Sequence, residues 1–212
     1  MNGIDMCLYR LCKNKSAWII LCLTLMITVA NLLDNDMGNT LYERFIISIN
    51  NGNWTLMFVF VAGHLVNSFI KKEYLKNLVG IIPSKNLCYC FSATISMYIG
   101  VVALLNSIVA ICCKLFGVVD TKFGIGKEEL IYLFFSVFQI CVISLAVIII
   151  ALVTKSTMVA IIFGVIWSAY FQDSIAMYIK KVTSYYQIVE ITLILISCIF
   201  INFIWSKKRE VY

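Results

Sequence analysis

The sequence predicts an all-α integral membrane protein with six transmembrane helices and both termini in the cytoplasm. Three observations support this prediction: the composition, six long apolar runs and the uneven placement of basic residues. Of the 212 residues, 62% are apolar and only 13% are charged, and the mean hydropathy is +0.94. A soluble domain carries about 25% charged residues. The composition therefore excludes a soluble globular domain.

The six apolar runs define the predicted elements in order. A helix needs roughly 20 mainly apolar residues to cross a bilayer, and continuous runs favour helices over a barrel of short alternating strands. Within a single transmembrane domain, 1–212, we predict spans at 17–33, 54–70, 87–113, 130–153, 157–172 and 185–205. The fifth run is short and contains Gly164. It either crosses incompletely or joins an outer-surface helix at 173–181.

Basic residues set the expected orientation, because cytoplasmic loops are enriched in Lys and Arg. One side holds 11 of the 17 basic residues, in the N-terminal segment, the second and fourth loops and the C-terminal tail. These are Arg10, Lys13, Lys15, Lys71, Lys72, Lys76, Lys85, Lys155, Lys207, Lys208 and Arg209. The other side carries more acids than bases. The net charge of +6 is thus a topology signal, and we expect no nucleic-acid partner.

The second loop, 71–86, has the pattern of a short amphipathic helix. Its apolar side chains recur at positions i, i+3, i+4 and i+7, which is one helical face: Leu75, Leu78, Val79 and Ile82. Pro83 disfavours helix at the residue before it and so ends the segment. About three turns are too few for a stable isolated helix, so the segment needs a surface to lie on. That surface is either anionic lipid or a protein partner.

Particular residues in this loop resemble the coupling tract of the ABC-2 family of ABC-transporter membrane subunits. The matching residues are Glu73, Lys76, Asn77, Leu78, Pro83, Ser84 and Lys85. Tyr74-Leu75 stands where the family often has Gly-Thr or Gly-Ser, and Lys85 replaces the usual Arg. The plan also resembles the small bacitracin-resistance and lantibiotic-immunity permeases. The family has six spans, a basic tail and a cytoplasmic elbow segment, here 1–16, in which Met6, Leu8, Tyr9 and Leu11 supply the apolar side chains.

The resemblance implies a permease subunit in a bacterial plasma membrane, working with a soluble ABC ATPase dimer and a second, identical or related permease. The implied ATPase-coupling residues are Lys72, Glu73, Leu75, Lys76, Asn77, Leu78, Val79 and Ile82, with a lesser contact from the loop at Lys155. No phosphate-binding loop motif is present, so ATP and Mg²⁺ are expected on the partner rather than on this chain, which is not itself an enzyme. The implied cargo is an antimicrobial peptide or a similar amphipathic compound, exported or expelled in self-immunity or resistance.

Polar residues within the spans are the remaining candidates for function. We expect Glu190 and Gln139 along a transport pathway, although Glu190 equally fits a residue that snorkels toward the interface. His64, Asn67, Asn106, Gln139 and Asn202 fit interhelical hydrogen bonds. Nine Cys and a single His provide no set of zinc ligands, so no metal site is predicted.

Two other functions stay open at this point. One is a small intramembrane peptidase, for which His64 would have to meet Cys88 or Cys90. The other is a stand-alone membrane carrier.

Overall fold

The computed structural model describes residues 3–34, 40–50, 53–70, 84–120, 122 and 127–178. In this part of the chain the regular elements are all helices, joined by turns and one isolated backbone bridge. The seven helices are α1 (Gly3–Cys12), α2 (Lys15–Leu33), α3 (Leu41–Asn50), α4 (Asn53–Ile70), α6 (Ser84–Leu115), α7 (Lys127–Thr154) and α8 (Thr157–Tyr178). The predicted all-α class is confirmed for these residues.

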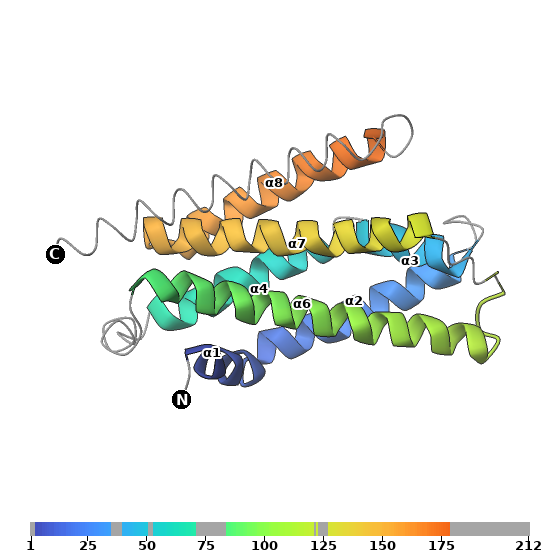
Figure 1. The fold of residues 1–212 in the computed structure, drawn as a ribbon, viewed down its shortest axis with the longest axis horizontal. Coiled ribbons are helices and arrows are strands. Elements are labelled where there is room, and N and C mark those ends of the chain that lie inside the picture. Colours follow the sequence, from blue (N-terminus) through green and yellow to red (C-terminus); the bar gives the residue numbers. More distant parts are fainter. Residues whose placement is uncertain are drawn as a thin grey trace.

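The long helices form an elongated bundle and run roughly along one axis (Figure 1). One end of the bundle, here called the α1 end, contains α1, the start of α2, the end of α4, the start of α6 and the α7–α8 turn. The other end, here called the α3 end, contains α3, the end of α2, the end of α6 and the start of α7. Successive long helices therefore alternate in direction, as membrane-crossing helices joined by short loops must.

Three helical stretches in the described residues are long and apolar enough to cross a membrane: Lys15–Leu33, Cys88–Leu115 and Ser136–Thr154. A fourth crossing arises if Leu41–Ile49 and Asn53–Ser68, which meet at a 44° bend, are counted as one broken span. These apolar helices identify the chain as a membrane-embedded protein. The six-span count stays a prediction, because the predicted span at 185–205 lies outside the described residues.

Helix α8 begins as an apolar segment, Thr157–Ala169, and continues without a break to Tyr178. No Pro or Gly follows Gly164 before residue 178, so nothing in this stretch stops the helix. One of the two expectations for the span predicted at 157–172 is that it joins a helix beyond residue 172. The structure has such a helix as far as residue 178.

Helix α3 closes the α3 end of the bundle through a buried arginine. The Arg44 guanidinium is 5% exposed, and its Nη1 donates to the C=O of Leu32 at 2.9 Å, which satisfies a carbonyl at the end of α2. A capping box starts α3. The N–H of Glu43 donates to the hydroxyl of Thr40, and the N–H of Thr40 donates to the Glu43 carboxylate, each at 3.2 Å. Asn31 then donates to Ser48 at 3.1 Å.

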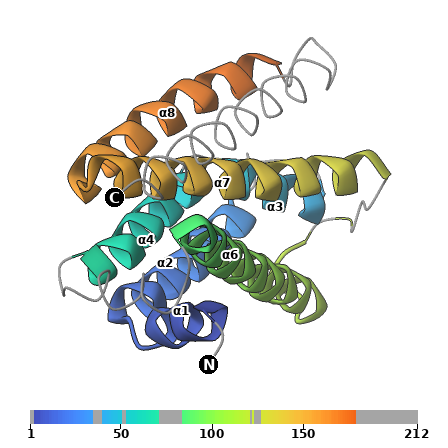
Figure 2. The same ribbon diagram turned by 60° about the vertical axis from the view of Figure 1, so that its left-hand side comes forward.

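Helix α1 packs against α6 and α2 as an amphipathic helix (Figure 2). Cys7 and Leu11 form its buried face, while Tyr9 is 57% exposed. Placing Tyr9 on the apolar face was therefore wrong. The Lys13 ammonium lies 5.5 Å from the centre of the Tyr9 ring and donates to its hydroxyl at 3.3 Å, an arrangement that favours exposure of both side chains. A turn capped by the Asn14 side chain leads into α2.

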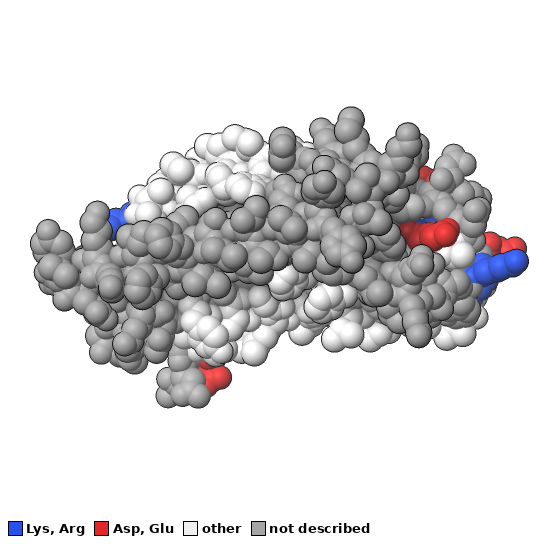
Figure 3. Space-filling model, turned by 45° about the horizontal axis from the view of Figure 1, so that its top comes forward, with Lys and Arg blue, Asp and Glu red and all other residues white. Residues whose placement is uncertain are grey.

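The charged side chains visible in Figure 3 lie toward the two ends of the molecule, and the described surface visible between them is uncharged. Of the side chains that the structure describes, four basic and one acidic lie at the α1 end: Arg10, Lys13, Lys15, Lys155 and Asp5. Three basic and three acidic lie at the α3 end: Arg44, Lys114, Lys122, Asp34, Glu43 and Asp120. Lys and Arg counts set orientation, and four against three differ little, so a cytoplasmic α1 end stays a prediction from the whole sequence.

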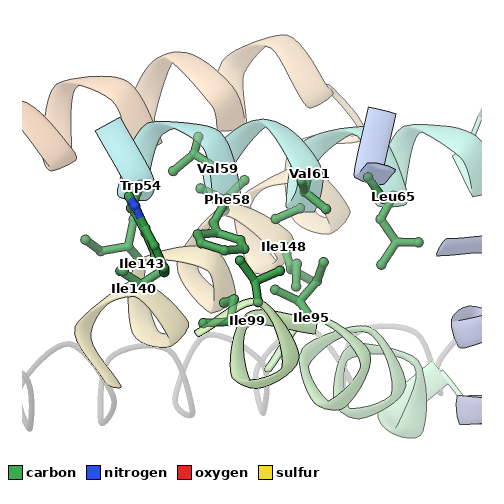
Figure 4. Close-up of a cluster of buried hydrophobic side chains, with 14 of the residues drawn as sticks. Trp54, Phe58, Val59, Val61, Leu65, Ile95, Ile99, Ile140, Ile143 and Ile148 are labelled. Atoms are coloured by element: carbon green, nitrogen blue, oxygen red, sulfur yellow. The ribbon is translucent and has the colours of Figure 1, made fainter. Parts of the chain in front are cut away.

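The core lies between α4, α6 and α7 (Figure 4). Phe58 is fully buried at its centre, with Ile95, Ile99 and Ile148 facing it from the neighbouring helices. A series of ring contacts also crosses the bundle, with centroids 6.5 Å apart for Phe45–Trp54, 6.0 Å for Trp54–Phe58 and 5.8 Å for Phe58–Tyr98. Edge and tilted ring pairs add to burial, so these contacts hold α3, α4 and α6 together.

Two glycines permit α4 and α8 to approach closely. A Cβ on Gly63 would lie 2.6 Å from Ile161 Cγ1. A Cβ on Gly164 would lie 2.6 Å from Val59 Cγ1 and 2.7 Å from Val147 Cγ2. Small residues at helix contacts are typical of membrane bundles, where close van der Waals packing replaces the hydrophobic effect between helices. Gly164 is therefore a packing residue.

Candidate functional site

The predicted ATPase-coupling residues, from Lys72 to Ile82, lie outside the described residues, as does Glu190. The two helices that the coupling segment connects are described. Helix α4 ends at Ile70 and α6 begins at Ser84, both at the α1 end of the bundle. The segment therefore joins the bundle at the end that carries the excess of basic residues.

The α7–α8 turn lies at the same end and has a defined geometry. Lys155 has a φ of +54°, the left-handed conformation that ends many helices. The Thr154 hydroxyl donates to Ile150 C=O at 2.7 Å, and the Ser156 N–H donates back to that hydroxyl at 3.3 Å. The N–H of Val159 donates to the Ser156 hydroxyl at 3.5 Å, which caps α8. These bonds define the backbone of the turn, and the Lys155 side chain is exposed there.

A narrow stripe on α4 is open although the helix is otherwise buried. Phe60 is 50% exposed, His64 is exposed and Asn67 is half-buried, and their spacing of four and then three residues places them on one helical face. The preceding turns add Asn53 and Met57 to the same stripe. Ionisable residues within membrane spans almost always face a bundle interior or a water-filled cavity. The stripe therefore places an ionisable side chain, His64, on an open face of α4.

Buried side-chain oxygen atoms without a hydrogen-bond partner occur on three of the long helices in the described residues. The Thr28 hydroxyl on α2, the Asn106 side-chain carbonyl on α6 and the Ser144 hydroxyl on α7 have no hydrogen-bond partner in the described part of the chain. Asn106 donates to Val102 C=O of its own helix at 2.8 Å. The expected interhelical bond from Asn106 is therefore wrong, because a side-chain amide four residues along reaches its own helix carbonyl first. Gln139 is half-buried on α7.

The buried cysteines of the described residues, Cys7, Cys88 and Cys90, have the surroundings of packing residues. The eight cysteines in the described part of the chain carry free thiols. Cys88 and Cys90 are buried on α6, and the Cys88 sulfur lies 3.9 Å from the Ser92 hydroxyl, while His64 is exposed on α4. Within the described residues no group of three His, Cys, Asp or Glu side chains is placed to hold a metal. The contacts of both thiols fit small apolar packers.

Two features of the α1 and α3 ends were not foreseen from the sequence. In the sequence, Arg44 counts only as one of the basic residues on the side that carries more acids than bases. In the structure its side chain is buried. The capping pair Thr40 and Glu43, three residues apart, is the sequence signal that indicates a helix at this position. An apolar pocket beside α1 has no comparable signal, because its walls come from three separate helices.

Comparison with protein-family models, with curated proteins and with solved structures found no match for this chain.

Proposed function

We propose that this protein is the membrane-spanning subunit of an ATP-driven transporter of the ABC-2 kind, which expels an amphipathic antimicrobial peptide or a similar compound from the membrane. The observation that carries the proposal is the resemblance of the segment between α4 and α6 to the family's coupling tract. Its support from the structure is positional: the ends of α4 and α6, the α7–α8 turn and the amphipathic α1 all lie at the more basic end of the bundle.

Force applied to this end would reach the whole bundle through contacts that the described residues make. Helix α4 packs against α7 and α8, and α6 packs against α7, α2 and α1. The aromatic series from Phe45 to Tyr98 links α4 to α6 across the core. Closure of two ATPase chains against the segment between α4 and α6 would tilt these two helices together, because neither can move without its packed neighbours.

The proposal includes a second permease subunit, identical or related, since six helices form half of a pathway in this family. The exposed stripe of Phe60, His64 and Asn67 on α4 supports this part of the proposal. A second subunit placed there would remove the imidazole from lipid and give it polar neighbours. A polar side chain that faces lipid has no hydrogen-bond partner there and is costly to bury unpaired, so such cover has a physical reason.

A cationic amphipathic peptide is the proposed cargo class. The α3 end, which would face outward, carries the carboxylates of Asp34, Glu43 and Asp120. Acidic groups at the mouth of a pathway raise the local concentration of cationic ligands. The substrate class otherwise rests on the likeness to small immunity permeases.

The test is purification of the tagged native complex in mild detergent, with ATP hydrolysis measured and the bound chains identified by mass spectrometry. We expect a phosphate-loop ATPase in fixed stoichiometry. Leu75→Glu or Leu78→Glu should abolish both its binding and the hydrolysis, because a charge on the apolar face opposes docking.

Phe116→Glu is the matched control for these variants. Phe116 is 82% exposed and lies at the α3 end, so the same change of charge should leave the ATPase bound. Circular dichroism must show the same helix content in every variant. A native complex without an ATPase, or Leu78→Glu complexes with unchanged hydrolysis, would contradict the proposal.

A further inference from the structure

An apolar pocket of about 220 Å³ lies between α1, the start of α2 and the middle of α6. Its walls include Leu8 from α1, Leu21 from α2, and Val101 and Leu105 from α6, and no polar atom lines it. An apolar cavity of about 150 Å³ in a soluble protein stays dry and binds benzene. A pocket of this size and character therefore suits a hydrocarbon ligand better than water.

The two polar groups nearest to the pocket are both turned away from it and satisfied. The indole N–H of Trp18 donates to the C=O of Cys12 at 2.7 Å. The hydroxyl of Tyr98 donates to the C=O of Ala17. These bonds fix two aromatic walls, and they join α2 to α1 and α2 to α6. The indole N–H of Trp18 and the hydroxyl of Tyr98 are therefore satisfied, and no polar atom lines the pocket.

The pocket opens on the apolar flank of α6. Met97, Val101 and Leu105 line it and are 52%, 54% and 38% exposed. These positions span two turns of α6, about 12 Å along the helix axis. A linear chain lying along α6 would therefore fill the pocket and emerge into the membrane interior.

One end of the pocket lies at the α1–α2 turn, where Cys12 and Trp18 line it and are both exposed. Lys13 and Lys15 flank this turn, and both are exposed. Asp5 is the one acid of α1 and the turn, and it lies in the first turn of α1, away from Lys15. The charge at this end of the pocket is therefore positive, which complements an anionic headgroup.

We propose that this pocket binds one acyl chain of an anionic phospholipid, whose headgroup phosphate lies at the turn between Lys13 and Lys15. The bound lipid fills the space between α1, α2 and α6 and fixes α1 against the bundle. This site does not depend on the transporter proposal, because it needs neither an ATPase nor a second subunit.

The test is native mass spectrometry of the detergent-purified protein after incubation with phosphatidylglycerol or phosphatidylcholine. We expect one retained phosphatidylglycerol per chain. Val101→Trp and Leu105→Trp should abolish retention, because an indole occupies the space of the acyl chain. Lys13→Gln with Lys15→Gln should lower the preference for phosphatidylglycerol about 25-fold, since each basic residue near an anionic surface contributes about a fivefold factor.

Ile108→Trp is the matched control, because Ile108 lies on the same face of α6 two turns beyond Val101, is equally exposed at 54%, and does not line the pocket. It should retain the lipid as the wild type does. All variants are compared for helix content and melting temperature. Equal retention of both lipids by the wild type, retention by folded Val101→Trp and Leu105→Trp, or equal loss in Ile108→Trp would overturn the proposal.

Discussion

Gly164 sets the distance between two helices by having no side chain. Its Cα faces Val59 of α4 and Val147 of α7, and a Cβ would come within 2.7 Å of a methyl carbon on each. The contacting atoms belong to β-branched valines, whose χ1 angles are stiff in a helix. Neither valine can rotate away easily, so extra volume at this position has to separate the helices.

We predict that Gly164→Ala lowers the stability of the bundle by about 1–3 kcal/mol, the usual cost of overpacking. Gly100→Ala on α6 is the matched control. No atom lies within 4 Å of a Cβ built there, so that change should raise stability by about 0.5–1 kcal/mol through helix propensity. Thermal melting of both variants in one detergent measures the difference. Equal melting temperatures for the two variants would mean that α4 and α8 do not pack as described.

Helix α1 shows what a family resemblance can and cannot predict about an element. The family resemblance implies an amphipathic elbow segment at 1–16, and the structure has an amphipathic helix at Gly3–Cys12. The direction of Tyr9 depends on Lys13, whose ammonium interacts with that ring, and helical spacing alone does not weigh this contact. The buried face instead uses Cys7 and Leu11. The resemblance thus predicts the helix, whereas the contact between Lys13 and Tyr9 decides which of its side chains are exposed.

The same distinction applies to the rest of the fold and to the site. Long apolar runs predicted α2, α6 and α7, because a 20-residue apolar stretch has few alternatives. Helix α3 was missed because its ten residues are too few for a membrane span, although the Thr40–Glu43 capping box indicates its start. The lipid pocket depends on where three helices meet, and a one-dimensional pattern does not contain that information.

The docking of α1 is testable through its two cysteines. Burial raises the pKa of the Cys7 thiol from 9.0 to about 12, and the neighbouring Cys90 adds to the shift. A shift of three units lowers the thiolate fraction at pH 8 about 1,000-fold, and the thiolate is the reactive form. We predict that maleimide labels the exposed Cys12 at pH 8 and leaves Cys7 unlabelled.

Trypsin separates the two sites, because Arg10 lies between them, so peptide mass spectrometry reads each one independently. Both cysteines should label after denaturation in SDS. A raised pKa also means that the folded state holds this proton more tightly. The contribution to stability is therefore complete below pH 9.0 and is lost as the pH rises toward about 12. Rapid labelling of Cys7 in the folded protein would show that α1 is detached.

At the scale of the whole molecule, α4 combines a central position in the bundle with an exposed stripe of side chains. It packs against α2, α3, α6, α7 and α8, which makes it the centre of the described bundle. Nevertheless it exposes Phe60 and His64 along one stripe. The exposed faces of α2 and α8 differ from this stripe of α4. Their large exposed side chains, such as Met26, Ile162 and Ile166, are apolar and suit contact with lipid. The exposed polar side chains of this stripe distinguish α4 from α2 and α8, and they support the proposal that a second subunit lies against it.

We predict that two copies of the chain meet along this stripe. In a background with the exposed Cys12 and Cys22 changed to Ser, Phe60→Cys should form a disulfide-linked dimer when native membranes are oxidised. Met158→Cys on α8 is the control: Met158 is 73% exposed, against 50% for Phe60, and should stay monomeric. A disulfide needs Cα atoms within about 7 Å, so only a true interface at Phe60 reacts efficiently. Adding His64→Leu to Phe60→Cys should weaken the cross-link, because the imidazole would no longer pair across the interface. Equal cross-linking at positions 60 and 158 would indicate random collision, and the stripe would then face lipid.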